Sequence, residues 1–174
     1  DDNTNVTVST NFADPSANMI KLGSNKVTYT GTNSSSGITT VKEGQLFING
    51  TASSSTVNID SGATLGGAGT IGGITNSGNL EPGNSIGTLN VSGAVTLNSG
   101  SVLVIEVDTA GNTDKIVATG AVTAGGTLRI SPGSGTYSSG QQYTIITGSS
   151  ISGTFSTITV LSCTGTASAS YGST

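Results

Sequence analysis

The chain has 174 residues, a net charge of −4, and unusually few charged (8%) or aromatic (4%) side chains. Its five basic residues are scattered along the sequence, which argues against a nucleic-acid-binding stripe or a polybasic membrane patch. Disordered chains usually carry many charges or prolines, whereas this chain has few of either and is rich in glycine, so a β architecture with tight turns is favoured.

The apolar residues occur in short, β-branched runs that end at turn residues, and no stretch has a convincing helical period. We therefore predict an all-β chain without helices. The predicted strands, in chain order, are residues 27–30, 45–48, 56–59, 73–75, 94–97, 102–107, 115–118 and 127–130.

A degenerate unit recurs, in which a short apolar strand is followed by Ser-Gly, a small residue, and Leu or Val. The Ser-Gly pairs begin at Ser61, Ser77 and Ser99, which gives a period of 16 to 22 residues. Such periods are typical of solenoids. The sequence therefore predicts a parallel β-helix of about eight coils, with an antiparallel β-sandwich as the alternative fold.

The ends of a solenoid expose unpaired strand edges and need a cap. At the C-terminal end we expect a hairpin-like closure formed by residues 143–146 and 153–155. At the other end, residues 11–20 are the least repetitive stretch and are expected to fold over the opening.

Residues 79–91 contain the pattern Leu-x-Pro-Gly-Asn-Ser-x-Gly-Thr-Leu. Pro-Gly sets a sharp turn because proline fixes φ and glycine permits positive φ, and the following asparagine can bond neighbouring backbone. This segment resembles the transport-associated repeat of autotransporter passengers. The matching positions are Leu80, Pro82, Gly83, Asn84, Ser85, Gly87, Thr88 and Leu89.

Segments on both sides of this repeat resemble the same family, so the resemblance covers about residues 38–160. Downstream it is similar to the family's autochaperone coils. The positions that carry this similarity are Asp114, Gly120, Gly126, Leu128, Gly153 and Phe155.

The resemblance implies a right-handed parallel β-helix with a capped C-terminal end, displayed or released at a Gram-negative outer membrane. It also implies that the C-terminal coils fold first and template the others. The implied partners are the family's own C-terminal β-barrel, which we expect to be absent from this sequence, and the outer-membrane assembly machinery. No apolar run is long enough for a membrane helix.

We accordingly expect one β-helix passenger fragment over residues 1–174. It divides into N-terminal coils or a cap (1–37), coils with the transport repeat (38–100), autochaperone-like coils (101–160), and an exit toward a missing linker and barrel (161–174).

Catalytic and metal chemistry find little support. Histidine is absent and Cys163 is the only cysteine, so Ser-His-Asp triads, internal disulfides and cysteine-based zinc sites are not available. Residues 108–114 lack the ligand spacing of a calcium loop. The candidate carboxylates stand in different strands and turns, with no clustering visible from sequence. They are Asp60, Glu81, Glu106, Asp108 and Asp114.

The sequence thus predicts a non-enzymatic chain without cofactors, which serves as structural stalk and folding template of an autotransporter passenger. One alternative is an adhesin or self-association module, whose flat Thr/Asn-rich faces bind a host surface or another copy. A remote alternative is a glycan-active enzyme, for which a carboxylate cluster in the folded chain would be the sign.

Overall fold

The computed structural model describes residues 5–11, 14–161 and 167–172, and all regular structure in these ranges is β-strand. The prediction of an all-β fold is therefore confirmed. The strands are β1 (Val6–Val8), β2 (Met19–Lys21), β3 (Lys26–Tyr29), β4 (Thr39–Val41), β5 (Gln45–Ile48), β6 (Thr51–Ile59), β7 (Thr64–Gly67), β8 (Thr70–Asn76), β9 (Asn79–Pro82), β10 (Thr88–Val91), β11 (Val95–Leu97), β12 (Val102–Val107), β13 (Lys115–Ala118), β14 (Val122–Ala124), β15 (Thr127–Pro132), β16 (Ile146–Thr147), β17 (Ile151–Gly153) and β18 (Thr157–Val160).

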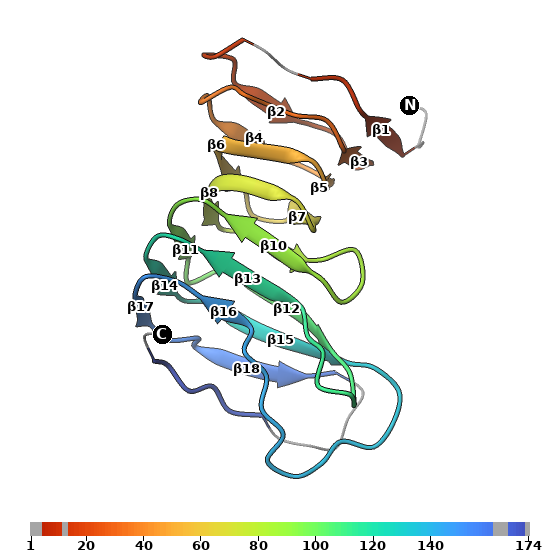
Figure 1. Cartoon of the computed structure of the whole chain (residues 1–174), viewed down its shortest axis with the longest axis vertical. Coiled ribbons are helices and arrows are strands. Elements are labelled where there is room, and N and C mark those ends of the chain that lie inside the picture. Colours follow the sequence, from red (N-terminus) through yellow and green to blue (C-terminus); the bar gives the residue numbers. More distant parts are fainter. Residues whose placement is uncertain (1–4, 12–13, 162–166, 173–174) are drawn as a thin grey trace.

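The strands form two sheets, which we call the first and the second sheet. The first has the order β1-β3-β5-β7-β9-β12-β15-β18, and the second contains β2, β4, β6, β8, β10, β11, β13, β14, β16 and β17. Named strands pair in parallel with strands from the preceding and following coils. Figure 1 shows the coils stacked in sequence order. This arrangement is consistent with a parallel β-helix and contradicts the antiparallel sandwich.

Each of the eight predicted strands overlaps a strand of the structure. The coil length, however, varies more than the predicted 16 to 22 residues. In the first sheet, Leu65 pairs with Leu80 only 15 residues later, whereas Leu128 pairs with Ile158, 30 residues later. The long coils keep their strands in register because the additional residues lie in loops such as residues 133–145.

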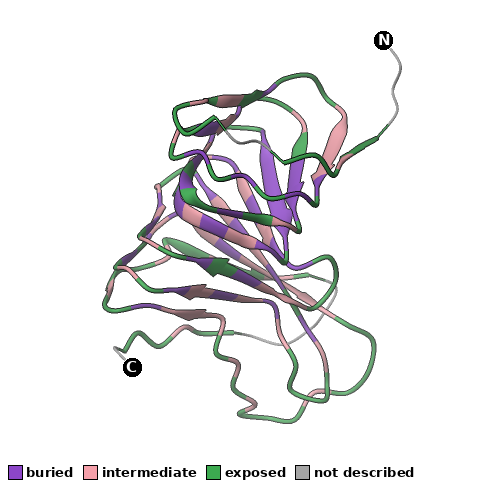
Figure 2. Cartoon of the chain, turned by 45° about the horizontal axis from the view of Figure 1, so that its top comes forward, coloured by how far each residue is buried: buried purple, intermediate pink, exposed green. Residues whose placement is uncertain are grey.

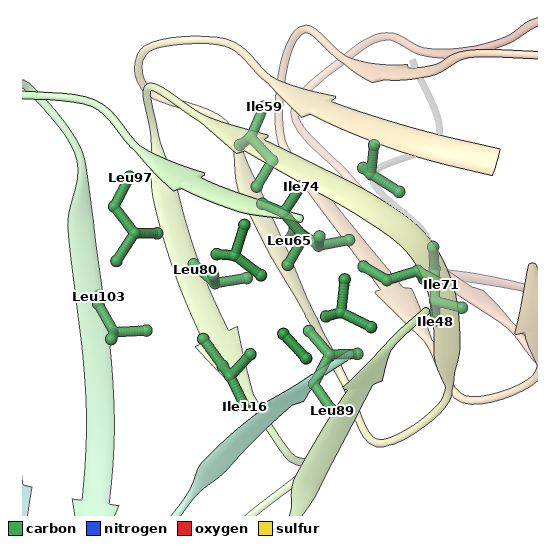
Figure 3. Close-up of a cluster of buried hydrophobic side chains, with 14 of the residues drawn as sticks. Ile48, Ile59, Leu65, Ile71, Ile74, Leu80, Leu89, Leu97, Leu103 and Ile116 are labelled. Atoms are coloured by element: carbon green, nitrogen blue, oxygen red, sulfur yellow. The ribbon is translucent and has the colours of Figure 1, made fainter. Parts of the chain in front are cut away.

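The core lies between the two sheets, and buried residues alternate with more exposed ones along many of the strands (Figure 2). Leu65, Leu80 and Leu103 stack on one another through the strand register of the first sheet and are fully buried. Isoleucine and leucine side chains from the second sheet, among them Ile74 and Leu89, lie in the same cluster (Figure 3). Each fully buried side chain of this kind stabilises the fold by about 1.5–3 kcal/mol.

The interior of the N-terminal coils is more polar. Ser55 is fully buried; its hydroxyl donates to the Gly37 carbonyl at 2.6 Å and lies 3.0 Å from the Thr39 hydroxyl. One coil earlier, the Ser35 hydroxyl donates to the Ala17 carbonyl. Hydroxyl–carbonyl bonds therefore replace apolar packing at this corner.

Lys21 is also buried in this part of the chain. Its ammonium group donates to the carbonyl oxygens of Leu22, Gly23 and Glu43 at 2.6 to 3.0 Å. Burial lowers the pKa of Lys21, against a smaller raising effect of the Glu43 charge. The three carbonyl acceptors are what allows a charged side chain to lie at this corner.

The expected hairpin-like closure at the C-terminal end is wrong. β16 pairs in parallel with β13, and β17 pairs in parallel with β14, so both strands continue the second sheet. Phe12, in the expected N-terminal cap, and Cys163 lie outside the described residues.

Candidate functional site

The segment that matches the transport repeat forms β9, a loop at residues 83–87, and β10. Leu80 on β9 and Leu89 on β10 are fully buried and point into the core (Figure 3). They belong to different sheets, because β9 pairs with β7 and β12 whereas β10 pairs with β8 and β13. The two leucines therefore anchor both ends of a loop that turns the chain from one sheet to the other.

Gly83 makes the turn at the start of this loop. Its φ is +89°, and it forms an antiparallel bridge with Gly67 through N–H to carbonyl bonds of 2.9 and 3.1 Å. A Cβ atom here would lie 2.2 Å from the Ser85 carbonyl oxygen and 2.7 Å from a carboxylate oxygen of Asp114. Only glycine fits this position, as the Pro-Gly pattern predicts.

Asn84 connects the loop to earlier coils. Its side-chain amide donates to the side-chain oxygen of Asn49 at 2.8 Å, and the same oxygen accepts the backbone N–H of Ala68 at 3.1 Å. The sequence suggested bonds to neighbouring backbone, whereas the actual partner lies 35 residues earlier. Asn49 was missed as a site residue, and its only signal was the Asn49-Gly50 turn.

Asp114 connects the loop to the following coil. One carboxylate oxygen accepts the backbone N–H of Gly87 at 2.9 Å, and the other accepts the backbone N–H of Glu106 at 2.8 Å. The side chain is only 3% exposed. Asp114 was predicted both as an autochaperone-like position and as a candidate carboxylate, and the structure places it against the transport-repeat loop.

Three of the five candidate carboxylates lie around one hollow of about 180 Å³. They are Glu81, Glu106 and Asp114, and the wall also includes Phe47 and the loop. The expectation that the carboxylates are unclustered is therefore wrong for these three. Strand pairing brings Glu81 and Glu106 together, because β9 and β12 are neighbours in the first sheet, and hydrogen bonds with the Glu106 backbone place Asp114 beside them. Asp60 and Asp108 are not part of this hollow.

The electrostatics of the hollow follow from burial and like charge. Burial raises the pKa of Asp114 to about 6, against the two N–H bonds, and the charges of Glu106 and Glu81 add to the increase. Burial also raises the pKa of Glu81, where the Glu106 charge adds and the Arg129 charge opposes. Both oxygens of Asp114 already accept backbone N–H groups, so its evident role is to hold the loop.

Phe47 forms the aromatic wall of the hollow. Its ring lies against Gly66, where an added Cβ would come within 2.7 Å of the ring. The ammonium group of Lys26 lies 3.6 Å from the ring centroid on the neighbouring strand. The ring is therefore covered on two sides, and Phe47 is only 9% exposed.

The other autochaperone-like positions lie in later coils. Leu128 is buried in the core, and Gly126 and Gly153 have positive φ at turns. Phe155 lies near Tyr171, with ring centroids 6.4 Å apart, and Gly120 packs on the Gly93 backbone. Among these described positions, Asp114 is the one whose side chain is hydrogen-bonded to the transport-repeat loop.

Among the residues that the structure describes, no group of three or more His, Cys, Asp or Glu side chains is arranged to hold a metal ion. In the same ranges, no helix is long and apolar enough to span a membrane.

No protein-family model matches the chain. An extracellular serine protease of Serratia marcescens is 38% identical over 115 residues, which cover 65% of this chain and 11% of that protein. The chain therefore spans about a tenth of the length of this relative. The similarity is thus between about two thirds of this chain and a short stretch of an extracellular protein.

Proposed function

We propose that this chain is a structural stalk and folding template of an autotransporter passenger, in which the coils wind as a right-handed β-helix. The observation that carries the proposal is the cross-coil bonding of the transport-repeat loop. Asn84 bonds to Asn49 in an earlier coil, and Asp114 of a later coil bonds to Gly87. A loop held from both sides sets the register of several coils at once, as a template must.

The proposed location is the cell surface or the medium, and the extracellular relative supports it. We also propose that this chain has no catalytic role of its own. The carboxylate cluster around the hollow does not favour a glycan-active enzyme, because both oxygens of Asp114 already accept backbone N–H groups. The relative is described as a protease, but the match covers a small part of it. Because this chain has no histidine, its own residues cannot complete a Ser-His-Asp triad.

A capped C-terminal end belongs to the same proposal. Support comes from Tyr171, whose hydroxyl oxygen accepts the backbone N–H of Phe155 at 2.9 Å. This contact folds residues 167–172 back onto the last coil. The tail would then cover strand edges that otherwise expose unpaired backbone groups.

The decisive test removes residues 80–160 from the full-length precursor and measures surface display of folded, protease-resistant passenger. We expect display to be lost. A control deletion of residues 14–44 should retain more display, because it leaves both the transport repeat and its partner Asn49 intact. Normal display without residues 80–160 would contradict the stalk-and-template function.

A second candidate function is self-association through the outer face of the second sheet. Strand register aligns a column of uncharged polar side chains there, all of them exposed or half-exposed. The column consists of Thr40, Asn58, Thr75, Thr96, Thr123 and Ser152. Replacement of Thr75 and Thr96 by lysine should abolish any concentration-dependent dimer seen by analytical ultracentrifugation. A wild-type chain that stays monomeric at high concentration would exclude this candidate.

A further inference from the structure

We infer that Asp114 is a positioning residue, a proton-responsive latch that ties the transport-repeat loop (residues 83–87) to the start of the next coil. The geometry is that of a clamp with two jaws. One oxygen holds the Gly87 N–H in the loop, and the other holds the Glu106 N–H at the end of β12. The latch is a property of the fold, and only its role in passenger folding rests on the proposed function.

Further contacts around Asp114 hold the same two backbone segments, the loop and the end of β12. Asp114 and Glu106 also pair through the Asp114 N–H, which donates to the Glu106 carbonyl at 2.9 Å. On the other side, Gly83 packs so closely on the Asp114 carboxylate that no side chain fits between them. Release of the carboxylate would therefore free the loop and the end of β12 together.

The surroundings make the clamp sensitive to protons. The side chain is almost fully buried, and the facing titratable groups, Glu106 on β12 and Glu81 on β9, are both acidic. The charges of Arg129 and Lys26 lower the pKa of Glu81. Burial and these carboxylates raise the pKa of Asp114 to about 6 in the closed state.

The sign of the effect follows from linkage. In an open state exposed to water, Asp114 returns to its ordinary pKa of 3.8, so the closed state binds the proton more tightly. Acid therefore favours closure, by about tenfold between pH 7.5 and pH 5. A neutral carboxyl keeps lone pairs on both oxygens, so both N–H groups retain an acceptor.

The experiment is amide hydrogen exchange on the full 174-residue chain, expressed as protection factors at pH 7.5 and pH 5. In the wild type, we expect the Gly87 and Glu106 amides to gain about tenfold in protection at pH 5. D114N should lower their protection at both values and remove the pH dependence, because an amide nitrogen cannot accept an N–H bond. Equal wild-type protection at both values, or an unchanged pH dependence in D114N, would overturn the latch.

The matched control is D108N. Asp108 also accepts backbone N–H groups, from Ala110 and Asn112, but its bonds are exposed and its hydrogen bonds with Asn112 lower its pKa. D108N should leave the pH dependence at Gly87 intact, and its loss in D108N would contradict the assignment to Asp114. If D114N does not fold, the latch is tested instead by following the titration of the Asp114 carboxyl group in the wild-type chain by NMR. A midpoint near 6 supports the latch, and a midpoint at or below the ordinary value refutes it.

Because these measurements use purified protein without export, they separate the latch from the proposed function. If the latch is absent but display still requires residues 80–160, the stalk-and-template function is unaffected. If the purified wild-type chain shows the latch but a passenger lacking residues 80–160 is still displayed normally, only the stalk-and-template function is refuted.

Discussion

The N-terminal region (residues 14–59) and the central region (residues 62–132) share one architecture but use their interiors differently. The central region stacks leucines such as Leu80 and Leu103 in its core. The N-terminal region buries Lys21 and Ser55, and it exposes Leu22 by 64%. Since apolar burial is the main stabilising term and a buried hydrogen bond contributes less than a buried large apolar side chain, the central region should be the more stable part.

The transport-repeat loop adds to this difference. Within the central region it is bonded to Asp114, 27 residues later, and it also bonds to Asn49 at the edge of the N-terminal region, 35 residues earlier. In the N-terminal region, the buried hydroxyl of Ser55 reaches back only 18 residues, to Gly37. Changes in the central region should therefore have larger effects on unfolding than equivalent changes in the N-terminal region.

The largest effect is expected for G83A. The alanine methyl group would collide with the Ser85 carbonyl and the Asp114 carboxylate at a φ of +89°, so we expect a loss of at least about 3 kcal/mol in unfolding free energy. The matched control is G62A, where φ is +86° and nothing lies within 4 Å. It should cost only about 1–2 kcal/mol by urea denaturation. Equal losses in the two variants would contradict the close packing of the loop on Asp114.

A smaller effect is expected for L80A. Removing this fully buried side chain leaves a cavity and should cost about 2–5 kcal/mol in urea denaturation. L22A in the N-terminal region should change stability by no more than about 0.5 kcal/mol, because Leu22 is largely exposed. A loss of unfolding free energy as large as that of L80A would contradict the exposure of the Leu22 side chain.

The smallest effect is expected for S55A. The change leaves the Gly37 carbonyl and the Thr39 hydroxyl with one partner fewer, at a cost of about 1–2 kcal/mol. S53A lies on the same strand at an exposed position and should be neutral within about 0.5 kcal/mol. The Tm values of the two variants are compared by thermal unfolding followed by circular dichroism. Equal Tm values would show that the hydrogen bonds of the Ser55 hydroxyl do not stabilise the fold.

The strands also differ in how far the sequence predicts them. Strands with alternating apolar residues, such as β12, follow from period and composition. Short strands such as β7 (Thr64–Gly67), with the sequence Thr-Leu-Gly-Gly, lack that signal and become strands because neighbouring coils supply both partners. The variable coil length could not be predicted, since loops absorb added residues without disturbing the register.

The candidate site shows the same limit. Leu80, Pro82 and Gly83 belong to one contiguous pattern, so the turn was predictable from the sequence. The contact of Asp114 with Gly87 joins residues 27 positions apart, and the clustering of Glu81 with Glu106 arises from strand pairing. Such contacts depend on the coil length at that point, which the sequence pattern did not determine.

The central claim is that the central region forms the stable part of the stack, on which the remaining coils depend. Native-state hydrogen exchange of the whole chain under increasing urea tests it most directly. We expect amides of β9, β10 and β12 to exchange only through global unfolding. Those of β2 and β4 should exchange through a separate opening that is at least about 100-fold more frequent. Equal or greater protection of β2 and β4 would contradict the claim.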